Sequence, residues 1–259
     1  MKDTQLQKLT EAHYNEFPFD FLSKQDELRI EEMQPSAFLR FTDRYLMPGM
    51  RVAEIGCGPG RGTLFMERRG INLLAVDISV ESLRLAEMRA PKCEYILANN
   101  LDLPLADESF EAVISDGVIH HTPDAFKAFS ENARILQIGG VMYVAVYRRK
   151  RYYYYIYTYI GKPTRWLEKK IWGKALIYCT LLPLYFAVHL AKSRGKRTWH
   201  GAKSFFYDYI ITPQATFHTY EQILEWGLSN NLELIEYEKN IGNVHAFVFR
   251  KKSKNNSKH

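Results

Sequence analysis

A glycine-rich turn follows an apolar stretch that has the length of a buried strand. Residues 51–55 read Arg-Val-Ala-Glu-Ile, glycines stand at positions 56, 58 and 60, and residues 63–69 can form a helix. Glycine permits positive φ and lets a ligand approach the bare main chain, while free N–H groups at a helix start favour a negative group. This strand, turn and helix predict a site for a nucleotide-like cofactor.

The spacing of the glycines narrows the choice of cofactor. A dinucleotide fingerprint requires G-x-G-x-x-G, and the sixth position is not glycine whether the count starts at Gly56 or at Gly58. The pattern is instead Glu54-x-Gly56-x-Gly58-x-Gly60. A glycine-rich turn between a strand and a helix can also be purely structural, so other segments must show whether this turn binds a cofactor.

A second acidic residue follows at an informative distance. Residues 72–76 read as a buried parallel strand that ends in Asp77, 21 positions after Gly56. A carboxylate there can accept two hydrogen bonds from a ribose diol, as an acid about 20 residues on does in dinucleotide sites. The alternative is that Asp77 only caps the helix predicted for residues 79–89, and the two roles are compatible.

Two further segments follow the glycine-rich turn and the strand that ends in Asp77, which makes four informative segments. Residues 94–115 contain a strand, then Asn-Asn-Leu-Asp-Leu-Pro at 99–104 and Asp-Glu-Ser-Phe-Glu-Ala-Val at 107–113. Residues 116–124 read Asp-Gly-Val-Ile-His-His-Thr-Pro-Asp. In this order, the four segments resemble the class I S-adenosylmethionine (SAM) dependent methyltransferases. The last segment is similar to the type 11-like branch, which includes ubiquinone and menaquinone biosynthesis enzymes.

This resemblance implies a cofactor and a set of residues that bind it. The cofactor is SAM, converted to S-adenosylhomocysteine, and no metal is expected. In relatives an Asp usually contacts the adenine amine; Asn99 holds that place, and its amide oxygen can accept the same hydrogen bond. The expected cofactor-binding residues are Tyr14, Glu54, Gly56, Cys57, Gly58, Gly60, Asp77, Ile78, Asn99, Asn100, Leu101, Asp116 and Gly117.

His120 and His121 are the candidates for a catalytic base, because they follow the fourth predicted strand, at the edge of the sheet where ligands bind. Adjacent side chains cannot easily face one site together, so we expect one histidine to point inward and one to be structural. A purely structural role for both is the alternative. Methyl transfer from SAM is an in-line displacement, so positioning of the acceptor is expected to dominate catalysis.

The whole chain is predicted to be α/β. We expect a doubly wound, Rossmann-like sheet of seven strands with strand seven antiparallel, and a helical, aromatic lid insertion between strands five and six. A helix at residues 124–138, ended by Gly139-Gly140, should precede the fifth strand. The expected parts are an N-terminal cap segment (1–35), a SAM-binding core (36–147), the lid insertion (148–218), a C-terminal helix and hairpin (219–250) and a basic tail (251–259).

Charge and cysteine content bear on partners and location. Residues 1–150 carry a net charge of −4 and residues 151–259 one of +10. The three cysteines show neither a paired framework nor metal-ligand spacing, and the N-terminus lacks the apolar core of a signal peptide. We therefore expect a cytoplasmic protein.

The insertion contains an apolar run at 176–191 and many aromatic residues. The run is interrupted by Pro183 and is shorter than the about 20 residues of a membrane span, so we expect a lid whose stripe Ile177, Leu181, Leu184 and Val188 packs on the domain. The alternative is peripheral membrane contact through residues 152–197, supported by flanking bases that include Arg197.

Candidate substrate-binding residues are Phe17, Tyr147, Tyr207, Asp208 and His218. Tyr14 and Phe17 could equally fill the outer core.

These features predict a methyltransferase that acts on an O, N or C atom of an apolar, aromatic or lipid-like small molecule. Two alternatives remain open. One is an RNA methyltransferase, favoured by the basic insertion, although a nucleic-acid partner is not expected because the Asn/Asp-Pro-Pro-aromatic motif is absent. The other is a catalytically silent module that binds SAM or docks on membranes.

Overall fold

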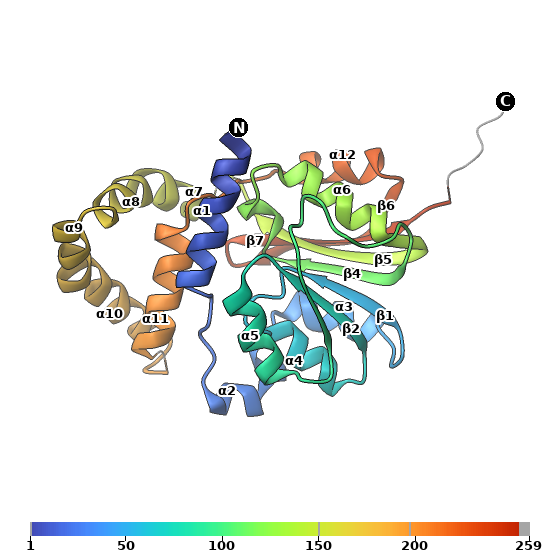
Figure 1. Cartoon of the computed structure of the whole chain (residues 1–259), viewed down its shortest axis with the longest axis horizontal. Helices are drawn as coiled ribbons and strands as arrows, with labels where there is room; N and C mark the ends of the chain where they lie inside the picture. Colours follow the sequence, from blue (N-terminus) through green and yellow to red (C-terminus); the bar gives the residue numbers. More distant parts are fainter. Residues whose placement is uncertain (1, 150, 197, 254–259) are drawn as a thin grey trace.

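The computed structural model describes residues 2–149, 151–196 and 198–253, which are organised around one mixed sheet (Figure 1). Within these residues the sheet has seven strands in the order β3-β2-β1-β4-β5-β7-β6. The first five strands are parallel, and β7 lies antiparallel between β5 and β6. The predicted fold class is confirmed. The strands are β1 (Arg51–Ile55), β2 (Asn72–Asp77), β3 (Glu94–Leu97), β4 (Phe110–Asp116), β5 (Leu136–Tyr147), β6 (Leu232–Ile241) and β7 (Val244–Lys251).

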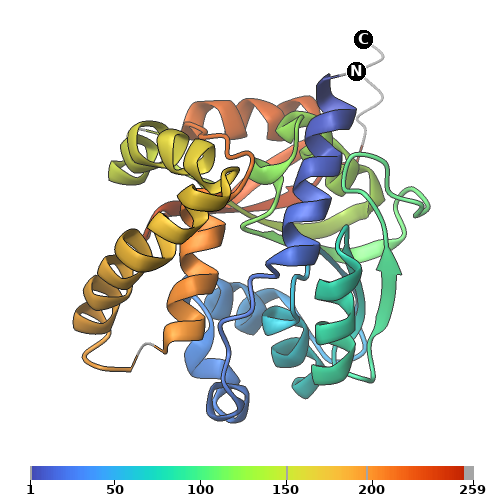
Figure 2. The ribbon, with the colours of Figure 1, turned by 60° about the vertical axis from the view of Figure 1, so that its left-hand side comes forward.

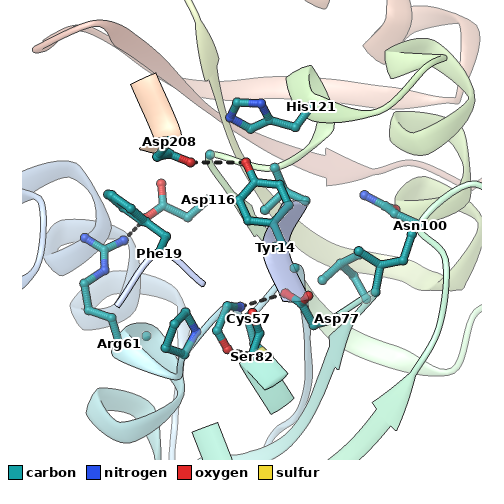
Figure 3. Close-up of a pocket in the computed structure, with 18 of the residues that line it drawn as sticks. Tyr14, Phe19, Cys57, Arg61, Asp77, Ser82, Asn100, Asp116, His121 and Asp208 are labelled. Carbon is teal, nitrogen blue, oxygen red and sulfur yellow. Dashed lines mark hydrogen bonds and ion pairs between the residues drawn. The ribbon is translucent and has the colours of Figure 1, made fainter. Parts of the chain in front are cut away.

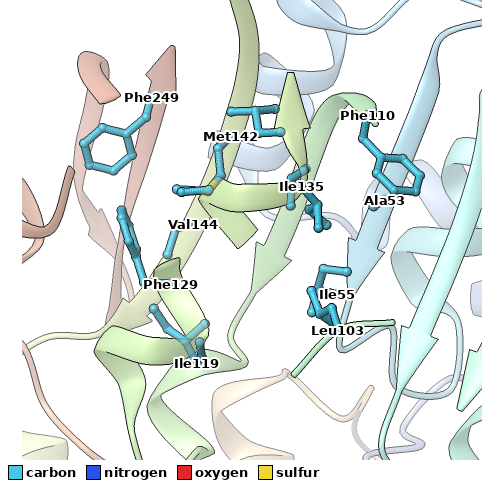
Figure 4. Packing of buried hydrophobic residues seen from close by; sticks show 14 of the residues in the cluster. Ala53, Ile55, Leu103, Phe110, Ile119, Phe129, Ile135, Met142, Val144 and Phe249 are labelled. Carbon is cyan, nitrogen blue, oxygen red and sulfur yellow. The ribbon is translucent and has the colours of Figure 1, made fainter. Parts of the chain in front are cut away.

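Apolar layers cover both faces of the sheet. On one face, α6 (Ala125–Ile135) and α12 (Tyr220–Ser229) pack on the central strands, and the rings of Phe129 and Phe249 meet edge to face at 5.7 Å (Figure 4). On the other face lie η1 (Ile30–Met33), α3 (Ser36–Tyr45) and α4 (Arg61–Arg68), with α5 (Val80–Arg89) beside α4. Because the central strands are covered on both faces, their sequences are continuously apolar instead of alternating.

The prediction for residues 124–138 was wrong at its C-terminal end. Helix α6 ends at Ile135, and Leu136 already pairs with Phe110 in the sheet. Gly139 and Gly140 lie inside β5, where the register shifts between β4 and β5. Gly139 has a φ of +80°, and a Cβ on Gly140 would stand 2.8 Å from the carbonyl oxygen of Glu111. The two glycines therefore form a bulge within the strand.

The insertion (residues 148–218) is helical, as predicted, and lies at one side of the sheet (Figures 1 and 2). Lys150, Arg197 and residues 254–259 of the predicted basic tail lie outside the described residues. In both views α11 stands between α10 and the N-terminal helix. The elements are α7 (Tyr152–Tyr155), η3 (Ile156–Gly161), α8 (Lys162–Glu168), α9 (Ile171–Leu176), η4 (Ile177–Leu181), α10 (Leu182–Lys192), α11 (Trp199–Phe206) and η5 (Tyr207–Ile211).

The apolar stripe predicted within the insertion is correct at Ile177 and Leu181, which pack in its apolar cluster, and is wrong at Leu184 and Val188, where the packed positions are shifted by one residue. Ile177 is buried, but Leu184 and Val188 are 64% and 44% exposed, and the fully buried residue is Leu182. Segment η4 is a π-helix, which adds one residue to a turn and rotates everything that follows. The packed face accordingly continues through Leu182 and Tyr185. The predicted stripe turns partly toward solvent.

The N-terminal segment forms a long helix that joins the core to the insertion. Helix α1 (Lys2–Glu16) is followed by α2 (Lys24–Leu28). The hydroxyl of Ser79, at the start of α5, donates to the carbonyl of Tyr14, and Ser204 of α11 donates to the carbonyl of Asp20. Residues 2–35 thus contact both the core and the insertion.

Candidate functional site

A cavity of about 370 Å³ opens at the carboxyl ends of β1, β2 and β4 (Figure 3). One side is made by the turns that follow these strands. The other side is made by α1 and by residues of α11 and η5. Three separate parts of the chain therefore enclose the same space, in the position where open α/β sheets bind ligands.

The three glycines of the turn after β1 have different surroundings in the structure. Gly56, with φ +78°, faces Val118, whose side chain a Cβ would overlap. Gly60, with φ +86°, starts α4, and its Cβ would stand 2.8 Å from the Cα of Ala86 in α5. Gly58, with φ +52°, has nothing within 4 Å of a Cβ and lines the cavity. Of the three, Gly58 leaves space for a ligand to approach the main chain.

Asp77 connects two of these turns. Its carboxylate accepts the N–H of Gly58 at 2.8 Å and the N–H of Ser79 at 2.9 Å, and it lines the cavity. Burial raises the pKa of the Asp77 carboxyl, while the two N–H groups oppose that shift. The cap of α5 is Ser79, whose hydroxyl accepts the N–H of Ser82, so helix capping does not account for Asp77.

Glu54 is buried at the end of β1 and also lines the cavity. The hydroxyl of Thr63 donates to its carboxyl at 2.6 Å. Burial raises the pKa of Glu54 to about 8, with Thr63 and Arg61 acting in the opposite direction. Arg61 itself forms an ion pair with Asp116 at 2.6 Å. Glu54 therefore has no direct ion-pair partner among the described residues and is neutral near pH 7.

Asn99 and Asn100 both line the cavity but differ in their partners. The side-chain oxygen of Asn99 accepts the N–H of Leu101 at 3.0 Å. The amide nitrogen and oxygen of Asn100 are buried without a hydrogen-bond partner within the described residues. A buried amide without hydrogen-bond partners destabilises the folded protein unless a bound ligand supplies those partners. The residues present therefore fit a polar, base-like ligand group at Asn100.

The far wall of the cavity holds a buried cluster of titratable groups. The hydroxyl of Tyr14 in α1 donates to Asp208 of η5 at 3.1 Å, and the ring of Tyr14 meets that of His121 edge to face at 5.9 Å. Burial raises the pKa of Asp208, while His121 and the hydroxyls of Tyr14 and Tyr147 oppose that shift. Figure 3 shows Tyr14, His121 and Asp208 grouped on one side of the cavity, across from Asp77.

The two histidines have different hydrogen-bonding states. His121 Nδ1 lies 2.7 Å from the carbonyl oxygen of Gln214, which only accepts, so Nδ1 carries the hydrogen and Nε2 keeps its lone pair. His120 Nδ1 accepts the N–H of Tyr147 at 3.3 Å, which places its hydrogen on Nε2. Burial lowers the pKa of both imidazoles. Both line the cavity and are neutral near pH 7, and the geometry gives His121 the free lone pair of a base.

Five residues predicted for the site lie outside the cavity lining. Phe17 stacks on Tyr207 with centroids 3.8 Å apart, within the apolar contact between α1 and the insertion. His218 contacts Thr216 at 2.8 Å and packs on Trp226. The three side chains therefore lie outside the lining of this cavity, and their contact with a substrate stays a prediction. Gly60 serves helix packing and Leu101 lies in the apolar core.

The other predicted residues line the cavity, together with several residues that the sequence did not single out. Phe19, Phe205 and Tyr209 form an aromatic wall; the aromatic density of their segments is a signal for such a wall, but it does not show where the rings lie. Arg89 lines the cavity and is held by Asp20 and Glu27 at 2.9 and 2.8 Å. No group of three or more His, Cys, Asp or Glu is arranged as metal ligands within residues 2–149, 151–196 and 198–253. The predicted lining residues are Tyr14, Glu54, Gly56, Cys57, Gly58, Asp77, Ile78, Asn99, Asn100, Asp116, Gly117, His120, His121, Tyr147 and Asp208.

Comparison with known proteins agrees with this geometry. Residues 53–144 match the family profile described as a methyltransferase domain. The chain is 35% identical over 103 residues to a probable tRNA methyltransferase 9B of Bos taurus, covering 39% of this chain and 22% of that protein. It is 30% identical over 118 residues to a ubiquinone/menaquinone biosynthesis C-methyltransferase of Campylobacter jejuni, covering 43% of this chain and 50% of that protein. The chain thus spans half or less of these relatives.

The fold has solved counterparts over nearly its whole length. A magnesium protoporphyrin IX methyltransferase from Synechocystis, solved with bound SAM, superposes with a TM-score of 0.57 at 12% identity, covering 95% of this chain and 97% of that one. At this identity the likeness establishes the fold. The insertion is included in the covered share, so the resemblance extends beyond residues 53–144.

Glu54 should make stability fall as pH rises. The folded protein keeps a proton on this carboxyl up to about pH 8, whereas the unfolded chain loses it near the ordinary pKa of 4.5, so the free energy of unfolding decreases between these values. The slope approaches about 1.4 kcal/mol per pH unit. Urea unfolding of the cofactor-free protein between about pH 6.5 and 8, above the ordinary titration of histidine, should show this decline. Glu54→Gln should flatten it; Glu87→Gln, at an exposed position of α5, should not.

Gly58 and Gly60 should separate ligand binding from stability. Alanine at either site takes a left-handed conformation, which costs about 1–2 kcal/mol. Gly58→Ala fills open cavity space and should weaken SAM binding about tenfold or more by calorimetry, with a small further loss of stability. Gly60→Ala overlaps the α5 backbone and should lower the unfolding free energy more strongly. Wild-type SAM affinity in Gly58→Ala would contradict the placement of the ligand.

Proposed function

We propose that this chain, a class I SAM-dependent methyltransferase by its domain match and its fold, transfers a methyl group to an O, N or C atom of an apolar, aromatic or lipid-like small molecule. The observation that carries the acceptor class is the aromatic wall opposite the glycine turn. Because the chain spans half or less of its curated relatives, its activity is inferred from its own residues.

The cofactor side of the cavity contains the groups that SAM requires. Asp77 would accept hydrogen bonds from the ribose diol, Asn100 would pair with a polar edge of the adenine, and Gly58 would let the main chain approach. Glu54 lies deeper, at the end of β1. When bound, SAM supplies a methyl group on a positively charged sulfonium and leaves as S-adenosylhomocysteine.

The acceptor side is aromatic and offers no unpaired cation among the described lining residues. Phe19, Tyr147, Phe205 and Tyr209 line it, and the two arginines of the lining are engaged in ion pairs with carboxylates. Such walls favour a flat, apolar molecule and offer little to a phosphate group. We therefore assign the insertion (residues 148–218) the role of a substrate lid.

His121 is the residue placed to accept a proton from the acceptor. Its Nδ1–H is held by the carbonyl of Gln214, which fixes the ring and directs the lone pair to Nε2. Burial keeps the imidazole neutral, and Asp208 lies near enough to favour the charged form once a proton arrives. His120, with its lone pair engaged by the main chain of Tyr147, serves to hold the end of β5 against the site.

A nucleic-acid acceptor is the second candidate. Curated relatives include probable tRNA methyltransferases, and residues 148–218 contain 14 Lys and Arg against two Asp and Glu. Binding of RNA to this surface would weaken steeply with salt, since each phosphate contact releases a counterion. The cavity itself favours the first candidate, because its walls are aromatic and its arginines are paired.

The acceptor class can be tested with SAM that carries a labelled methyl group. The purified protein is incubated with this SAM and an extract of its own cells, and the products are partitioned between organic solvent and water. We expect label in a small, solvent-extractable product heavier by one methyl group. Label confined to nuclease-sensitive material would favour the second candidate instead. The Gly58→Ala protein provides a background with weakened cofactor binding.

Removal of the His121 lone pair should affect turnover and leave cofactor binding intact. His121→Gln should lower kcat by about 10²-fold or more, the usual contribution of a positioned base, with an unchanged Kd for SAM. In the wild type kcat should hold down to below the ordinary histidine pKa of 6.5, because burial lowers the pKa of His121. His120→Gln should cost less, and His200→Gln, at an exposed position of α11, should have no effect. Unchanged turnover in His121→Gln would contradict the role.

A further inference from the structure

Exposed apolar side chains are concentrated on the insertion. Of the 22 large hydrophobic side chains that are exposed in the described part of the chain, 12 belong to residues 148–218. They include Trp166, Trp172 and Trp199, which are 58%, 59% and 42% exposed, and Ile171, which is 93% exposed. Single exposed apolar residues are normal, but a cluster of this size marks a surface that contacts something apolar.

The centre of this cluster is the continuous helical stretch Ile171–Lys192. It is 22 residues long, its most apolar window of 18 residues has a mean hydropathy of 1.5, and 17% of that window is buried. Residues 175–191 contain no Asp, Glu, Lys or Arg. A helix in a protein core would be mostly buried, and a helix facing water would carry a polar face. This one has an apolar outer face, which includes Leu176, Leu184 and Val188.

Positive charge surrounds that apolar face. The residues 148–218 carry 14 Lys and Arg against two Asp and Glu. One acid, Asp208, is buried in the cavity wall, and the other, Glu168, pairs with Lys174 at 3.2 Å. Exposed lysines and arginines lie at both ends of the helix: Lys169 and Lys170 precede it, Lys174 lies in its first turn, Lys192 is its last residue, and Arg194 and Lys196 follow it. The surface thus combines tryptophan, aliphatic side chains and cations, which suits an anionic lipid surface.

We propose that the outer face of Ile171–Lys192 docks on an anionic membrane leaflet and lies in its interface. A second copy of the chain would bring two strongly basic insertions together, and a nucleic acid would leave the apolar face uncovered. The charge and the apolar face together favour lipid.

The helix is placed to lie on the membrane and not to cross it. Its inner face is held by Ile177 and Leu182, which pack with Phe206 of α11. It continues from α8 and leads to α11, and both of these pack against η5 on the same side of the molecule. A span would need the two ends on opposite sides of a hydrocarbon layer about 30 Å thick. In Figures 1 and 2, α9 and α10 form the outermost part of the insertion, away from the sheet.

Docking there would bring the lipid surface close to the acceptor wall. Helix α11 packs on α10, while Phe205 of α11 and Asp208 and Tyr209 of η5 line the cavity. One helix therefore separates the docked face from the site. This step rests on the proposed lipid-like acceptor, whereas the docking itself does not.

The test is co-sedimentation of the full chain with vesicles of phosphatidylcholine alone or with added phosphatidylglycerol. We expect binding to the anionic vesicles that weakens with salt. A triple variant, Trp172→Gln, Leu184→Gln and Val188→Gln, should lower the partition coefficient about tenfold or more, because it removes three exposed apolar groups from the face. Lys192→Glu with Lys196→Glu should lower it as well.

A control replaces three apolar residues elsewhere that are more exposed than those of the triple variant, Leu28→Gln, Met88→Gln and Leu228→Gln, and should bind vesicles like the wild type. SAM calorimetry on every variant reports folding independently of the membrane. Failure of the wild type to bind either vesicle, or equal loss in the control, would overturn docking. A concentration-dependent dimer abolished by the triple variant would assign the face to a second copy instead. Each of these results is independent of whether a methylated product is found.

Discussion

The site depends on two hydrogen bonds that the carboxylate of Asp77 accepts from the main chain. This carboxylate accepts N–H groups from Gly58 and Ser79, and so fixes the turn after β1 against the turn after β2. Parallel strands bring these turns to one edge, but they do not set the spacing between them. That spacing is set by the hydrogen bonds and by Gly60, which lets α4 approach α5 at Ala86. The cavity is the space that remains at Gly58.

Closing this space requires two segments that are far apart in the sequence. Helix α1 supplies Tyr14 and η5 supplies Asp208, and their hydrogen bond joins residues 194 positions apart in the far wall of the cavity. Around it, Phe17 stacks on Tyr207, so the apolar contact that holds the segments together lies beside the polar contact that faces the site. The insertion therefore has two faces with different tasks: one completes the wall, and the other is turned away from the sheet.

Much of this arrangement could be predicted from the sequence, because local patterns determine it. The glycine turn, Asp77 and the strands follow from spacing and apolar runs, and the cavity lies where they predict. What failed depends on non-local packing. The π-helical segment η4 shifts the buried face from Leu184 to Tyr185, and no periodicity reveals an extra residue in a turn. Tyr207 and Asp208 are neighbours in sequence, yet they point to the α1 contact and to the cavity respectively.

The distribution of charge along the chain would determine which part of the molecule faces an anionic surface. Residues 1–150, which include most of the sheet, carry a net charge of −4, and residues 151–259 carry +10. Near an anionic surface the first part is repelled and the second attracted, so the chain would approach with its insertion leading. Because the same insertion supplies Phe205, Asp208 and Tyr209 to the cavity, orientation by charge would also orient the acceptor wall toward lipid. The proposed membrane docking and the proposed lipid-like acceptor are thus consistent with each other.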